Sequence, residues 1–171
     1  MNRRGILSLS AITAVGLAML PAAAIGRQKT LKQQLVGTWM FVSSVDTNKE
    51  GVKSDRWGPN AKGLFIFEAN GRYSFMIARP DIPKFSAANV TQGTAEEYKA
   101  VVTGMIAWIG TWSVDESTKT ITTNIDAGSF PNFNGTSQTR VISSLTVDEL
   151  KYTNAVTSTG TVVESVWRRA K

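Results

Sequence analysis

The sequence Gly37-Thr38-Trp39 opens the first clear strand of this chain, and Trp167-Arg168-Arg169 closes the last one. A flat indole can plug the floor of a small barrel, and a guanidinium can stack on that ring from outside. We interpret Trp39, with Arg168 or Arg169 as its partner, as the structural closure of a barrel. The alternative interpretation makes Trp39 a platform for a ligand.

The stretch 63–79 predicts a β-hairpin around Asn70-Gly71. A two-residue turn would pair Glu68 with Tyr73, whereas a three-residue turn with a left-handed Gly71 would pair Glu68 with Arg72. We prefer the second register, because it sets opposite charges across from each other and collects the aromatic rings on the other face.

The rest of the chain predicts further short strands and little helix. A capping box at Thr94 and Glu97 starts one mid-chain helix, which we expect to run to about Ala107. A helical turn within 25–34 would cover one barrel end. With short turns between most strands, the pattern predicts an all-β fold, an eight-stranded up-and-down antiparallel barrel with one short mid-chain helix. The expected strands are 35–45, 63–69, 72–79, 108–115, 119–126, 137–145, 149–156 and 161–168.

Residues 1–24 have the pattern of a secretory signal peptide. Arg3-Arg4 precedes an apolar run from Ile6 to Leu20, and Ala22-Ala23-Ala24 offers a cleavage site. The run is shorter than the roughly 20 residues that span a bilayer, so we expect no membrane span after cleavage. We expect a periplasmic or secreted bacterial protein, exported by the Sec route or the twin-arginine route, with one domain over 25–171.

The composition excludes several classes of function. The chain has no histidine and no cysteine, which excludes a Ser-His-Asp triad, a thiolate nucleophile and the usual zinc site. We find no glycine-rich phosphate loop and expect neither a metal nor a cofactor. The net charge of +6 falls to +4 without Arg3 and Arg4. The remaining basic residues are scattered, so we expect no nucleic-acid partner.

Taken together, these features resemble the bacterial lipocalin-like domain family. The resemblance implies an eight-stranded barrel of the calycin type, with one open end and a small apolar cavity. The family's Trp-x-Arg pattern favours Arg169 as the partner of Trp39. The segments that carry the resemblance are 35–39, 63–64, 70–73, 79–81, 93–97, 129–132, 135–136 with Gln138 and Arg140, and 167–169.

Aromatic residues and two arginines are the candidates for ligand binding. The rings could line a cup or simply pack as core. Arg79 and Arg140 could point inward, where a buried cation needs a partner such as Glu164 or a ligand carboxylate, or they could lie outside or pair internally. The candidate ligand-binding residues are Phe65, Phe67, Tyr73, Phe75, Arg79, Trp108, Trp112 and Arg140.

The preferred function is therefore an exported, lipocalin-like protein that binds a small hydrophobic or amphipathic molecule in the barrel cup. One alternative is an isomerase or cyclase that uses Glu164, Tyr73 or Asp126 for acid–base work. The other is a packed envelope domain that binds nothing. A buried carboxylate beside a cavity would favour the enzyme, a cavity with rings and arginine alone would favour binding, and a filled interior would favour the packed domain.

Overall fold

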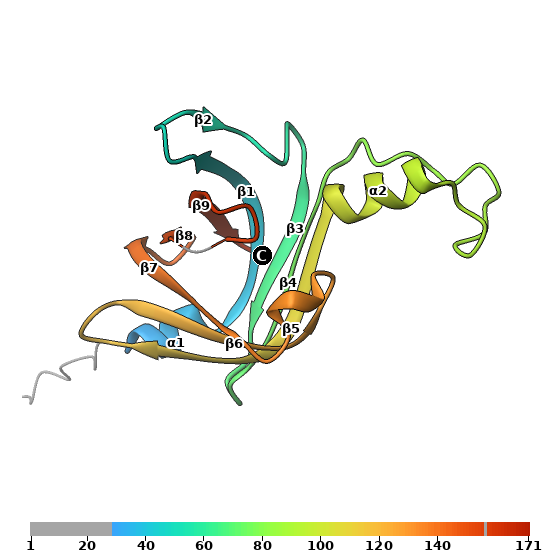
Figure 1. Ribbon diagram of the computed structural model, residues 1–171. Coiled ribbons are helices and arrows are strands. Elements are labelled where there is room, and N and C mark those ends of the chain that lie inside the picture. Colours follow the sequence, from blue (N-terminus) through green and yellow to red (C-terminus); the bar gives the residue numbers. More distant parts are fainter. Residues whose placement is uncertain (1–28, 156) are drawn as a thin grey trace, which may run out of the picture.

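A closed antiparallel barrel dominates the computed structural model, which describes residues 29–155 and 157–171 (Figure 1). Each barrel strand pairs with the next barrel strand along the chain, and β1 also pairs with β9, so the eight-stranded up-and-down barrel is confirmed. The two-residue strand β2 (Lys53–Ser54) pairs only with the end of β1. The barrel strands are β1 (Gly37–Thr47), β3 (Lys62–Phe67), β4 (Arg72–Ala78), β5 (Met105–Asp115), β6 (Thr120–Gly128), β7 (Ser137–Leu145), β8 (Glu149–Asn154) and β9 (Val162–Arg169).

The first strand is bent so that it can pair on both sides. Its beginning pairs with β3, and from Trp39 onward it pairs with β9. A register shift between Phe41 and Ser43 marks a bulge. Such a bulge bends a strand and shifts its alternation by one residue, so Ser44 and Asp46 become buried while Ser43 and Val45 face outward. Strict alternation along β1 would place Ser43 and Val45 on the face of Trp39, and the bulge moves them to the other face.

The β3–β4 hairpin has the register preferred from the sequence. Phe67 pairs with Tyr73, and the amide of Glu68 donates to the carbonyl of Arg72 at 2.9 Å. Gly71 takes the left-handed conformation, with φ of +88°, that this turn requires.

The mid-chain helix is shorter than predicted. The helix α2 (Ala95–Gly104) begins at the predicted capping box of Thr94 and Glu97. It ends at Gly104 because Met105 and the next two residues pair with β4 instead. The helix and the loop before it project away from the barrel (Figure 1). Of the described helices, none is both long enough and apolar enough to cross a membrane.

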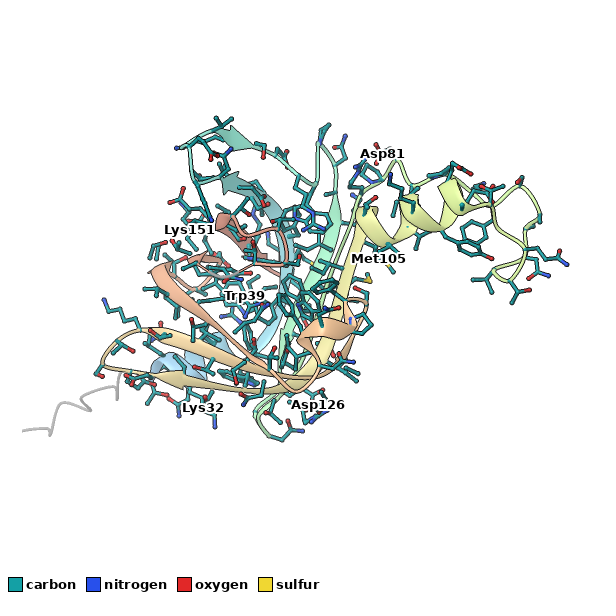
Figure 2. All side chains as sticks on the ribbon, in the orientation of Figure 1. Lys32, Trp39, Asp81, Met105, Asp126 and Lys151 are labelled. Atoms are coloured by element: carbon teal, nitrogen blue, oxygen red, sulfur yellow. The ribbon has the colours of Figure 1, made fainter. Side chains whose placement is uncertain are left out.

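A short helix and one buried ring close the floor of the barrel. The helix α1 (Leu31–Leu35) precedes β1, and the fully buried indole of Trp39 donates to the carbonyl of Leu35 at 2.8 Å. The Arg169 guanidinium lies 4.0 Å from the centroid of the Trp39 ring. It also donates to the carbonyls of Gln34, Val36 and Val147. Figure 2 shows Trp39 inside the barrel.

The glycine of the Gly-x-Trp motif has a steric role in this closure. Gly37 has a φ of +126°, and a Cβ atom there would lie 2.9 Å from a terminal nitrogen of Arg169. Glycine alone adopts such a conformation readily. The motif therefore leaves room for the guanidinium to reach the ring of Trp39.

Replacing Arg169 tests how much this closure stabilises the barrel. Arg169→Ala removes the stacking and leaves three carbonyls without their charged donor, so we expect a loss of about 2–4 kcal/mol in the free energy of unfolding. Arg168 is exposed and serves as the control; Arg168→Ala should change stability by less than about 0.5 kcal/mol. Urea denaturation measures both, and equal losses would contradict the assigned role of Arg169.

Candidate functional site

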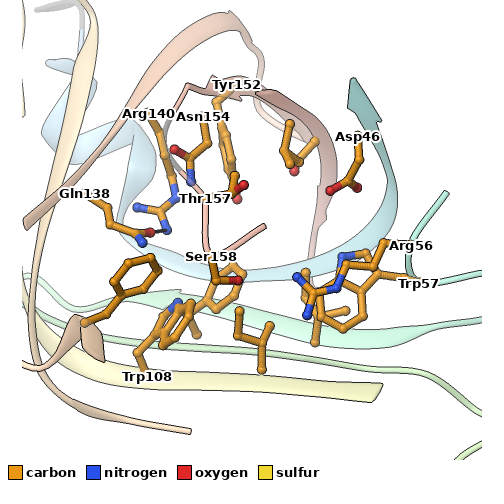
Figure 3. Close-up of a pocket in the computed structure, with 16 residues that line it drawn as sticks. Asp46, Arg56, Trp57, Trp108, Gln138, Arg140, Tyr152, Asn154, Thr157 and Ser158 are labelled. Carbon is orange, nitrogen blue, oxygen red and sulfur yellow. Dashed lines mark hydrogen bonds between the residues drawn. The ribbon is translucent and has the colours of Figure 1, made fainter. Parts of the chain in front are cut away.

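A cavity lies at the end of the barrel opposite Trp39 (Figure 3). The cavity has a volume of about 60 Å³. This is room for about four to six water molecules. Polar side chains form one part of its wall and apolar side chains the other. The lining residues are Asp46, Arg56, Trp57, Phe75, Ile77, Ile106, Trp108, Phe133, Gln138, Arg140, Tyr152, Asn154, Thr157, Ser158, Val163 and Ser165.

Three of the predicted ligand-binding residues line this cavity, namely Phe75, Trp108 and Arg140. Phe75 and Trp108 come from neighbouring strands, and their rings stack with centroids 6.1 Å apart. The alternation of β4 and β5 turns both rings inward, at the half of the barrel nearer its mouth.

Four predicted rings lie deeper and do not line the cavity. They are buried in the packed core: Phe65 and Phe67 are 4.0 Å apart between centroids, and Phe67 contacts Trp112 at 4.8 Å. Tyr73 packs against Phe65 in the same layer. Phe65, Phe67, Tyr73 and Trp112 therefore lie in the core beneath the cavity and do not line it.

Of the two orientations left open for Arg79, the structure has the outer one, and Arg79 does not line the cavity. The strand β4 ends at Ala78, so the alternation does not carry on to Arg79. The side chain is 39% exposed and forms an ion pair with Asp81 at 2.6 Å. Figure 2 shows Asp81 close to α2, outside the barrel.

The predicted acid–base groups also lie away from the cavity. Glu164 is exposed, because β9 turns Val163 and Ser165 toward the interior, so it is not the partner of Arg140. Asp126 forms a surface ion pair with Arg72 at 2.8 Å.

The buried guanidinium of Arg140 is the most unusual group in the cavity. Only 2% of the residue is exposed. It donates to the hydroxyl of Thr123 at 2.7 Å and to the side-chain carbonyl of Gln138 at 3.1 Å. No carboxylate of the described residues forms an ion pair with it, and its Nε has no hydrogen-bond partner there.

Aromatic faces partly compensate this charge. The ring centroids lie within about 6 Å of the guanidinium carbon, the range in which a cation is attracted to the face of a ring. The distances are 5.4 Å for Phe65, 5.7 Å for Phe75 and 5.7 Å for Tyr152. Burial raises the pKa of the Tyr152 hydroxyl, so it stays protonated and can donate.

The mouth holds charged groups that sequence reasoning missed. Asp46 is 4% exposed; its Oδ1 accepts a hydrogen bond from Thr161 at 3.0 Å, and its Oδ2 has no hydrogen-bond partner among the described residues. Burial raises the pKa of Asp46, while Thr161 and the charge of Arg56 act to lower it. The Arg56 guanidinium lies 4.7 Å from the ring centroid of Trp57. Nothing in the sequence marks the bulge that turns Asp46 inward.

The match to a family model decides what this barrel is. The model of the lipocalin-like domain matches residues 36–170. The chain belongs to the lipocalin-like domain family. This confirms the resemblance carried by the sequence motifs, and the matched residues include every barrel strand.

Three solved structures are similar to this lipocalin-like domain at low identity. A lipocalin-like protein from Bacteroides uniformis is 14% identical, with a TM-score of 0.44 over 80% of this chain and 99% of its own. A redesigned β-barrel is 14% identical, with a TM-score of 0.44 over 84% and 98%. A deswapped triple mutant of bovine odorant binding protein is 15% identical, with a TM-score of 0.40 over 80% and 74%. No curated protein matches the chain significantly.

Replacing Arg140 tests whether it serves the fold or the cavity. A buried charge without a carboxylate partner costs desolvation energy, so Arg140→Met should leave the ligand-free domain as stable as the wild type or up to about 3 kcal/mol more stable. Chemical denaturation of ligand-free protein measures this difference. A loss of more than about 1 kcal/mol would instead assign Arg140 to the structural core.

Asp46 should make stability depend on pH. Because its pKa is raised above the ordinary 3.8, the folded protein binds this proton more readily than the unfolded chain does. The wild type should therefore gain stability relative to Asp46→Asn as the pH falls from 7 toward 4, and the gain should level off below 3.8. Denaturation curves of both proteins between pH 4 and 7 check this sign. Parallel curves would contradict it.

Proposed function

We propose that the protein is an exported binding protein that holds a small hydrophobic or amphipathic molecule in its barrel cup. The observation that carries the proposal is the cavity between the rings of Phe75 and Trp108 and the polar wall at Arg140. Small eight-stranded barrels either fill their interior with side chains or hold one small ligand, and open space at the mouth supports the second outcome.

The barrel has a packed lower half and a cavity toward its mouth, and this arrangement also supports binding. Trp39 and the deeper rings close and fill the lower half, so a ligand has one route in. The cavity combines apolar rings with a few polar groups, as small-molecule sites usually do. In such sites the rings supply most of the affinity, and the polar groups fix the orientation of the ligand. These features argue against a fully packed envelope domain.

Export is the second part of the proposal, and it rests on the sequence pattern of residues 1–24. These residues lie outside the described part of the structure. A periplasmic or secreted location would give the cup access to molecules outside the cytoplasm.

One observation favours an acid–base enzyme as a second candidate. Asp46 is a buried carboxylate in the cavity, and burial raises its pKa, as is common for catalytic acids and bases. It takes the role that the sequence suggested for Glu164, Tyr73 or Asp126. Binding is the better supported function, because the other two charged side chains that line the cavity, Arg56 and Arg140, are arginines, which stay protonated and cannot exchange a proton with Asp46.

Filling the cavity should abolish binding. Ile106 lines the cavity, whereas Ile109 lies on the outer face of the same strand and is 48% exposed. We expect protein purified from its native host to carry a small molecule in native mass spectrometry, to lose it in Ile106→Trp and to keep it in Ile109→Trp. The same spectra should show a mature chain that begins near Ile25. Equal occupancy in both variants, or no bound molecule in the wild type, would contradict the proposal.

A further inference from the structure

The charges that line the cavity do not balance. Among the described lining residues, three side chains carry charge, namely Asp46, Arg56 and Arg140. Asp46 and Arg56 attract each other, since the charge of Arg56 lowers the pKa of Asp46. In Figure 3 these two lie on one side of the cavity, while Arg140 lies beside Gln138 on the other. With one acidic and two basic side chains the lining has a formal charge of +1, and Arg140 is the arginine that lies away from Asp46.

Arg140 also has unused hydrogen-bond donors. An arginine has five N–H groups, and two of its nitrogens donate here, to Thr123 and Gln138. The buried Nε has no partner, and neither does the indole nitrogen of Trp108, which lines the same cavity. Buried donors without acceptors are rare in folded proteins. Both residues line the cavity, although these two nitrogens are themselves buried, so an acceptor could reach them from the cavity after a small movement of the side chains.

The geometry points to a carboxylate-binding site at Arg140, with a small monocarboxylic acid as the ligand. This inference rests on the proposed function, since it names the chemical class of the molecule in the cup. The guanidinium fork matches the two oxygens of a carboxylate, and such charge-assisted hydrogen bonds are about twice as strong as neutral ones. The apolar body of the acid would lie against Phe75 and Trp108, which line the cavity near Arg140.

Charge and size both restrict the ligand. One uncompensated positive charge balances a monoanion, whereas a phosphate dianion would leave a buried negative charge. Room for about four to six waters holds a carboxylate and a few carbon atoms. A longer acid must extend past Arg56 and Trp57 through the mouth. Water can satisfy the free N–H groups but cannot neutralise the guanidinium.

A matched pair of probes tests the carboxylate. Hexanoate and hexanamide have the same shape and differ in charge, so calorimetry at neutral pH isolates the contribution of the anion. We expect the wild type to bind hexanoate at least about tenfold more tightly than hexanamide. In Arg140→Met the preference should vanish. Arg79→Met is the matched control, because Arg79 lies outside the cup in its ion pair with Asp81, and it should keep the wild-type preference.

Nuclear magnetic resonance of the wild type gives a readout that needs no variant to fold. Hexanoate should shift the Nε–H resonance of Arg140 and the indole N–H resonance of Trp108. The indole N–H groups of Trp39 and Trp112 already donate to the carbonyls of Leu35 and Glu68, so their resonances should stay in place.

The outcomes separate this inference from the proposed function. Equal affinity for the two probes, a preference that survives in Arg140→Met, or an unmoved Arg140 resonance would overturn the carboxylate site. Each would leave the binding function intact if native mass spectrometry still finds a molecule that Ile106→Trp excludes. Binding of neither probe also overturns the carboxylate site, and a wild type that carries no molecule from its host removes the binding function as well.

Discussion

The contact between Arg169 and Trp39 joins the two ends of the sheet, and the rest of the barrel depends on it. The guanidinium lies on the ring while donating to carbonyls of the segment before β1 and of the β7–β8 turn. It therefore ties the first strand, the last strand and the floor helix together. A sheet closed in this way leaves a free edge at the two-residue strand β2 but pairs each barrel strand with a neighbour on both sides, which removes most of the usual template for aggregation. It also gives the barrel one sealed end and one open end.

The sealed end explains the distribution of side chains inside. Near the floor, rings such as those of Phe67 and Trp112 pack at contact distance and exclude water. Toward the mouth the lining becomes mixed, and Arg140 lies between the two layers, with rings on one side and polar groups on the other. A guanidinium there costs stability, because its charge is buried without a counter-ion. Natural proteins carry such costs most often where a ligand offsets them.

The mouth contributes a different kind of chemistry. The charge of Arg56 acts to lower the pKa of Asp46, which burial raises, and the guanidinium of Arg56 lies over the ring of Trp57. This group comes from the end of β1 and the loop before β3, whereas Arg140 comes from β7. A ligand that entered the cup would therefore pass Asp46 and Arg56 before it reached Arg140. The helix α2 and the loop before it extend away from the barrel. The last residues of α2 and Met105 lie near Arg56 at the mouth.

The sequence by itself determined the order of strands, the register of the β3–β4 hairpin and the inward face of the aromatic residues. These features follow from local alternation and from turn chemistry at Asn70-Gly71, which act between near neighbours. The family motifs also selected Arg169 as the partner of Trp39. Only the tertiary structure decided which inward residues meet at the cavity. The bulge in β1 turned Asp46 inward, the end of β4 left Arg79 outside, and the phase of β9 exposed Glu164. For Asp46 and Glu164 the difference is one residue in the alternation, and for Arg79 it is the end of a strand. Pairing with a distant strand, rather than local sequence, fixes both.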